Sequence, residues 1–162
     1  YRNLDKEYVA EIYLGATTPS CDLETEINER FSIEHITNEL VLEVLSRFTG
    51  EQEQVPPLHS AKLINGKRAY EYARKGLNMK LAPVKVIFKE IELLSFKPPI
   101  SKIRIVCSKG TYVRSFARDF GLALGSGAYL SSLVRTAIGN FRLEDAYSLE
   151  DFKNFLEDLK QI

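Results

Sequence analysis

The spacing of apolar residues changes along the chain, and each change predicts a different kind of element. Residues 8–14 (YVAEIYL) are rich in strand formers and end at Gly15, which predicts a strand that runs into an irregular stretch over residues 15–26. From Thr37 to Gly50 the spacing is helical and both ends carry cap residues, which predicts an amphipathic helix. Its apolar face consists of Leu40, Val41, Val44, Leu45 and Phe48.

The middle of the chain follows the strand period and then returns to the helix period. Apolar residues recur at every second position in 84–88 and 103–107, on either side of Pro98-Pro99, which predicts two paired strands. Beyond Gly110 a helical spacing predicts a second amphipathic helix. Its buried face consists of Val113, Phe116, Ala117, Phe120 and Leu124.

A last helix should open at Ser148, with Asp151 three residues on as the second half of its cap. Its apolar residues, which we expect to be buried, are Leu149, Phe152, Phe155, Leu156 and Leu159. Strands interspersed with helices, without a βαβ repeat, indicate an α+β domain with a mixed, mainly antiparallel sheet flanked by helices. With 162 residues, 44% of them hydrophobic, the chain can form one core but not two, so a single domain over residues 1–162 is expected.

The charges of the chain cancel in sum but are segregated along it. Residues 1–56 carry 4 basic and 12 acidic side chains, residues 57–118 carry 14 and 3, and residues 119–162 carry 4 and 7. A basic middle third predicts a face that binds a polyanion such as nucleic acid, because phosphate contacts by Lys and Arg release counterions. A solvated surface balanced in space by the acidic thirds has the same composition, so charge alone leaves both readings open.

Several classes of protein are disfavoured by what the sequence lacks. Cys21 and Cys107 show no metal-ligand spacing and no disulfide framework, so no metal site is predicted and a reducing cytoplasm fits best. No apolar run approaches the roughly 18 residues that a membrane span needs, and residues 1–6 lack the apolar region of a signal peptide.

Three stretches carry recognisable motifs in a fixed order. The first joins residues 6–8 (KEY) through Leu14-Gly15 to residues 17–22 (TTPSCD). The second is residues 54–61 (QVPPLHSA) followed by 66–74 (GKRAYEYAR), and the third is residues 107–115 (CSKGTYVRS), with residues 127–141 behind it. By these motifs the chain resembles the bacterial tRNA pseudouridine-55 synthase family from about Lys6 to Phe141.

The resemblance implies an α+β pseudouridine synthase core that isomerises one uridine in the T-loop of tRNA, at position 55, without metal or organic cofactor. The family's nucleophilic aspartate lies in a G-x-L-D-P motif upstream of the strand that contains Tyr8, and this sequence has no such motif. We therefore expect the chain to be the C-terminal portion of the core, inactive by itself and without an additional C-terminal RNA-binding domain. Asp5, Asp22 and Asp119 are expected to be structural.

Four residues match positions at the family's active site. Tyr8 matches the aromatic platform for the flipped base, and Leu133 matches an apolar residue that covers it. Arg114 matches the partner of the nucleophilic aspartate, where an arginine lowers the pKa of a carboxyl and fixes its orientation. Tyr112 matches a tyrosine that contacts the base and moves its C5 proton, which is a catalytic role. Without the resemblance, these residues would be an ordinary strand tyrosine, a core leucine of a helix, a solvent-facing arginine and a helix-start aromatic.

Residues 59–80, with a short tyrosine-bearing helix between Gly66 and Gly76, resemble the segment that grips the T-loop. The residues predicted to bind RNA through its phosphates are Lys67, Arg68, Arg74, Lys75, Lys80 and Lys109. The chain departs from the family at Leu63, where a lysine is usual and Lys62 lies one place early. It also has Val134 in place of the first of two arginines.

Two other hypotheses remain open at the level of sequence. The chain would be a non-catalytic RNA-binding module if it uses the same basic and aromatic residues without chemistry. Alternatively, it would be a truncation product whose exposed sheet edges self-associate. The synthase reading predicts the T-arm of tRNA as partner and a monomeric full-length enzyme.

Overall fold

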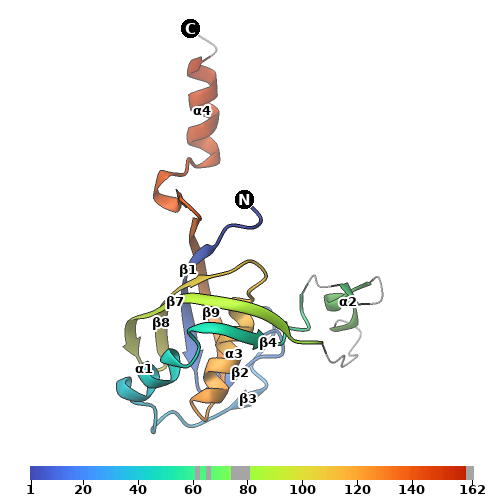
Figure 1. Ribbon diagram of the computed structural model, residues 1–162, viewed down its shortest axis with the longest axis vertical. Coiled ribbons are helices and arrows are strands. Elements are labelled where there is room, and N and C mark those ends of the chain that lie inside the picture. Colours follow the sequence, from blue (N-terminus) through green and yellow to red (C-terminus); the bar gives the residue numbers. More distant parts are fainter. Residues whose placement is uncertain (61–62, 65–66, 74–80, 160–162) are drawn as a thin grey trace.

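An antiparallel sheet forms the centre of the molecule (Figure 1). The computed structural model describes residues 1–60, 63–64, 67–73 and 81–159. In the described residues the sheet has six strands in the order β10-β9-β1-β8-β7-β4, and every pair is antiparallel. The strands are β1 (Lys6–Leu14), β4 (Gly50–Gln54), β7 (Val84–Lys97), β8 (Ile100–Cys107), β9 (Ala128–Ile138) and β10 (Phe141–Arg142). The expected α+β class and mainly antiparallel sheet are confirmed.

Helices and two small hairpins complete the described structure. The helices are α1 (Asn38–Ser46), α2 (Ala69–Ala73), α3 (Val113–Ala123), α4 (Leu149–Leu159) and a 3₁₀ turn, η1 (Leu143–Asp145). The hairpins pair β2 (Ala16–Thr17) with β3 (Glu29–Arg30), and β5 (Leu63–Ile64) with β6 (Lys67–Arg68). None of the helices in the described ranges is long and apolar enough to cross a membrane.

One face of the sheet packs on α1 and α3 and forms the core. Ala10 of β1 lies opposite Ile103 of β8, so alternate residues of both strands point to this face. Phe116 and Phe120 of α3 are fully buried against them. The predicted apolar faces of both helices and of the two predicted strands are therefore correct.

The start of α1 is as predicted, but its end is not. The Thr37 hydroxyl accepts a hydrogen bond from Leu40 N–H at 3.2 Å and caps the helix. The helix ends at Ser46, earlier than the expected stop at Gly50. Gly50 instead begins β4, where its φ of +101° turns the chain into the strand.

The last helix forms where predicted, but its apolar face is not buried by the described chain. Asp151 N–H donates to Ser148 Oγ at 3.0 Å, which confirms the cap. The five apolar residues of α4 are between 42% and 84% exposed, and the helix extends away from the sheet (Figure 1). The expectation that they are core residues was wrong, because a helical period identifies one face without identifying what packs on it.

Candidate active site

The side chain of Arg114 is held between two other segments of the chain. Gly110, at a φ of +83°, turns the chain out of β8, and Arg114 follows in the first turn of α3. Its Nη1 donates to Asp22 Oδ2 at 2.9 Å, and its Nη2 donates to the carbonyl oxygen of His59 at 2.8 Å. The side chain is 23% exposed. Two anchors on one planar guanidinium fix its orientation as well as its position.

Asp22 supplies the carboxylate of this ion pair. Glu24 N–H donates to Asp22 Oδ1 at 2.9 Å, and Leu130 N–H of β9 donates to the carbonyl oxygen of Cys21 at 3.0 Å, which ties the loop to the sheet. Burial alone would raise the pKa of Asp22, but hydrogen bonds from Ser20 and Glu24 and the charge of Arg114 together lower it. Asp22 is therefore ionised at neutral pH and balances the charge of Arg114.

A pocket of about 400 Å³ opens beside this pair. Its lining is Asp22, Leu23, Glu24, Arg114, Leu130, Ser131, Ser132 and Leu133. Leu133 lies on β9, not on a helix as its prediction as a core residue supposed, and it is 42% exposed. The structure thus brings Arg114 and Leu133 to one cavity, which has both a charged and an apolar wall.

Tyr8 lies on the strand next to Leu133. Leu133 pairs with Ala10 of β1, and Tyr8, two residues before Ala10, pairs with Arg135, so Tyr8 and Leu133 share one face of the sheet. Burial raises the pKa of the Tyr8 phenol, and the positive charge of Arg135 opposes this only in part. The ring is partly buried and uncharged at neutral pH.

The backbone of Tyr112 is bound by a buried glutamine. Gln54 Oε1 accepts from Tyr112 N–H at 2.8 Å, and Gln54 Nε2 donates to the Tyr112 carbonyl oxygen at 3.1 Å. No pattern in the sequence points to a role for Gln54. Asp22 is expected from the sequence to be a structural loop residue, whereas in the structure it is the ion-pair partner of Arg114.

The predicted RNA-binding residues are described only in part. Lys109 is exposed, and its Nζ donates to Asn3 Oδ1 at 2.7 Å. Lys67 and Arg68 form β6, which pairs with β5, but their side chains lie outside what the structure describes. Arg74, Lys75 and Lys80 lie outside the described residues altogether.

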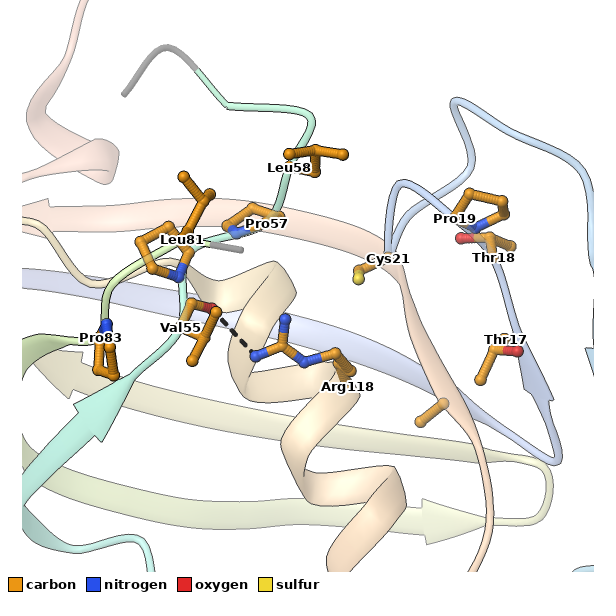
Figure 2. Close-up of a pocket in the computed structure, with 12 residues that line it drawn as sticks. Thr17, Thr18, Pro19, Cys21, Val55, Pro57, Leu58, Leu81, Pro83 and Arg118 are labelled. Carbon is orange, nitrogen blue, oxygen red and sulfur yellow. Dashed lines mark hydrogen bonds between the residues drawn. The ribbon is translucent and has the colours of Figure 1, made fainter. Parts of the chain in front are cut away.

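A larger pocket, of about 650 Å³, lies one helical turn further along α3, at Arg118 (Figure 2). Thr17, Thr18 and Cys21 lie on one side of it, and Val55, Pro57 and Leu81 lie on the other. The Arg118 guanidinium is already engaged, because Nη2 donates to the carbonyl oxygen of Val55 at 3.0 Å and Nε donates to Asp119 Oδ1 at 2.8 Å. Burial raises the pKa of the Cys21 thiol, which disfavours a thiolate.

The chain matches two family models that meet within α3. Residues 1–113 match the TruB family pseudouridylate synthase N-terminal domain, and residues 114–161 match the tRNA pseudouridylate synthase B C-terminal domain. The junction falls between Val113 and Arg114, in a helix whose buried residues belong to the common core.

Relatives and solved structures agree with these matches. The chain is 55% identical over 152 residues to tRNA pseudouridine synthase B of Phocaeicola vulgatus and 53% identical over 156 residues to that of Bacteroides thetaiotaomicron. Each match covers 94% of this chain and 65% of the relative, so the chain spans about two thirds of the length of these proteins.

The fold is similar to those of two solved complexes. A chain in the crystal structure of a Cbf5-Nop10-Gar1 complex superposes with a TM-score of 0.69 at 26% identity, covering 98% of this chain and 39% of that one. A chain in an H/ACA RNP bound to a substrate RNA containing 2'-deoxyuridine superposes with a TM-score of 0.65 at 24% identity, covering 99% and 37%, and shows likeness of fold alone. With family models matching it from residue 1 to residue 161, the chain belongs to the TruB family of pseudouridylate synthases.

Proposed function

We propose that this chain forms part of an enzyme that isomerises uridine to pseudouridine in the T-loop of tRNA, at position 55. The observation that carries the proposal is the anchored guanidinium of Arg114 beside a pocket that also contains Leu133. The relatives' name, tRNA pseudouridine synthase B, supports tRNA as the substrate. Arg114, Tyr112, Tyr8 and Leu133 are the residues to which we assign roles.

The reaction requires that the base leave its stack and turn while it stays bound. The C1′–N1 bond breaks and a C1′–C5 bond forms, while C5 loses a proton and N1 gains one, so substrate and product are isomers. A flipped pyrimidine is stabilised by stacking on an aromatic ring, by about 1–3 kcal/mol per base. We assign the ring to Tyr8, and to Leu133, which lies on the same face of the sheet, the cover of the base.

Arg114 would position the nucleophilic carboxylate of the family's G-x-L-D-P segment. A guanidinium has five N–H donors, and the contacts with Asp22 and His59 leave donors free for a second carboxylate. Asp22 already balances the charge of Arg114. Arg114 therefore lowers the pKa of the nucleophilic carboxyl less than an unpaired arginine would. In this arrangement Arg114 acts chiefly by orientation, and we assign to Tyr112 the contact with the base.

The proposal extends to the partner and the location of the enzyme. The T-arm of tRNA is the bound element, with phosphates contacted by the basic residues between 59 and 80 and by Lys109. We assign a monomeric, cytoplasmic enzyme, which is compatible with the two free cysteines that the structure shows.

The function is tested with a chain in which a segment that carries the family's G-x-L-D-P motif precedes Tyr1. We expect this chain to release tritium from a tRNA transcript labelled at C5 of uridine, to the extent of one uridine per molecule. A transcript with cytidine at the T-loop position should release none. RNA binding without tritium release would instead make the chain a non-catalytic RNA-binding module.

Neutralising Lys67, Arg68, Arg74 and Lys75 together, as glutamines, should weaken binding of a T-arm RNA and flatten its salt dependence. Each phosphate contact contributes roughly 0.7–0.9 to the slope of log K against log salt, so four contacts predict a slope shallower by about 3. The measurement is a binding titration at several salt concentrations. The control removes four cations that are already paired with carboxylates, which are Arg47, Lys85, Lys89 and Lys102. An equal change in both variants would place the RNA-binding face elsewhere.

A further inference from the structure

The side chain of Gln54 binds both backbone groups of Tyr112, which lies two residues before Arg114. Gln54 is the last residue of β4 and is 3% exposed. Its amide oxygen accepts from Tyr112 N–H and its amide nitrogen donates to the Tyr112 carbonyl oxygen, at 2.8 and 3.1 Å. A single hydrogen bond would let the backbone of Tyr112 rotate about that bond. Two hydrogen bonds, one to the N–H and one to the carbonyl oxygen, restrict this rotation.

Tyr112 depends on this contact because it is the N-cap of α3. Its backbone is extended, with φ −102° and ψ 107°, and its side chain makes no capping hydrogen bond. In the described part of the chain, the N–H of Tyr112 donates its hydrogen bond to Gln54 Oε1. The amide of Gln54 is buried, at 3% exposure, and a buried amide without hydrogen-bond partners is costly, so the conformation of Tyr112 is coupled to the glutamine.

The contact belongs to a set that fixes the first turn of α3 to the segment following β4. The Val55 carbonyl oxygen accepts from Ser115 Oγ at 2.8 Å and the His59 carbonyl oxygen accepts from Arg114. Within this set, Gln54 is the residue that contacts Tyr112. Gln54 itself does not line the 400 Å³ pocket. It acts on the site through other residues.

We infer that Gln54 is a positioning residue for the isomerisation, which holds the backbone of Tyr112 and thereby sets the start of the helix that carries Arg114. The inference rests on the proposed function. A displacement of about 1 Å at a reacting group costs on the order of 100-fold in rate. Loss of both hydrogen bonds should therefore lower the rate without removing a contact to RNA.

The test compares Gln54→Met with Gln52→Met in a chain that carries the G-x-L-D-P segment. Methionine keeps the length of glutamine and removes its hydrogen bonds. Gln52 lies two residues earlier on the same strand, and its Nε2 donates to the Arg47 carbonyl oxygen at 3.1 Å, away from α3. We expect Q54M to lower the single-turnover rate about 10- to 100-fold with RNA affinity within about two-fold, and Q52M to change neither.

Hydrogen exchange in the 162-residue chain gives a readout that needs neither activity nor a variant. Relative to their unfolded rates, the Tyr112 amide should exchange at least about ten-fold more slowly than the Gly110 amide. In Q54M, if it folds, the Tyr112 amide should lose this protection.

Four results would overturn the inference: an unprotected Tyr112 amide in the wild type, an unchanged rate in Q54M, equal losses of rate in Q54M and Q52M, or a loss of rate matched by a loss of RNA affinity. If the chain that carries the G-x-L-D-P segment and keeps Gln54 forms no pseudouridine, the proposed function is refuted and, with it, the positioning role of Gln54, even if the Tyr112 amide is protected. A failure of the inference alone is recognised when this chain is active.

Discussion

Replacing Arg114 by lysine should slow pseudouridine formation by about 100- to 1,000-fold in a chain that carries the G-x-L-D-P segment, with the affinity for tRNA nearly unchanged. Lysine keeps the positive charge. Its ammonium group lacks the planar array of donors that contacts Asp22 and His59 while leaving further donors for a second carboxylate. Because the charge survives and the geometry does not, the effect should fall on the chemical step.

The measurement is single-turnover kinetics beside a binding titration, with Arg104→Lys as the matched control. Arg104 is also partly buried and paired with carboxylates, those of Glu7 and Glu90. It lies on the face of the sheet away from α3, because its neighbour Ile103 points into the core. R104K should leave the rate within about two-fold. A normal rate for R114K would refute the role of Arg114, and lost affinity with a normal single-turnover rate would make Arg114 a phosphate contact.

Sequence patterns predicted the elements in which the helical or strand period of apolar residues runs without interruption. All five apolar residues predicted for α3 are buried, because a single helix face packs on the sheet without a kink. The strands around Pro98-Pro99 were recognised for the same reason, since residues 84–88 keep one register with β4 and residues 103–107 keep one register with β1.

Strand β9 escaped prediction because it is bulged twice. Its register with β1 shifts between Glu7 and Tyr8 and again between Glu11 and Ile12, so Ser131 and Thr136 have no opposing residue. Each inserted residue reverses which face the following side chains occupy, and this erases the period of two. Leu133 lies between the two bulges, so its place on a strand was not visible in the sequence.

The contacts of the candidate site were hidden for a different reason. Asp22 and Arg114 are 92 residues apart, and Gln54 and Tyr112 are 58 residues apart. No local period reports such a pair. Strand β4, which carries Gln54, is polar throughout and lies at the edge of the sheet, so it offered no apolar alternation to detect. The resemblance to the family pointed to Arg114, but only the structure shows that Asp22 is its ion-pair partner in this chain.

Replacing Phe116 by alanine should lower the free energy of unfolding by about 3–5 kcal/mol, because it removes the ring that joins α3 to the sheet and to the segment that follows α1. Phe116 is 0% exposed. Its ring centroid lies 5.1 Å from that of Phe48, 5.3 Å from that of Phe88 and 5.8 Å from that of Phe120. Such aromatic pairs contribute beyond the area that they bury.

Urea denaturation of the 162-residue chain measures this effect, with Leu122→Ala as control on the same helix. Leu122 is 64% exposed, so its truncation should change the stability by no more than about 0.5 kcal/mol.

Because Arg114 and Phe116 share the first turn of α3, the loosened helix should also weaken the Asp22–Arg114 ion pair, whose anchors come from other segments. The pKa of Asp22, measured by NMR, should then rise toward its ordinary value, since Arg114 is one of the groups that lower it. A loss of less than 1 kcal/mol for Phe116→Ala would show that α3 is not anchored by this aromatic cluster, and the orientation assigned to Arg114 would lose its support.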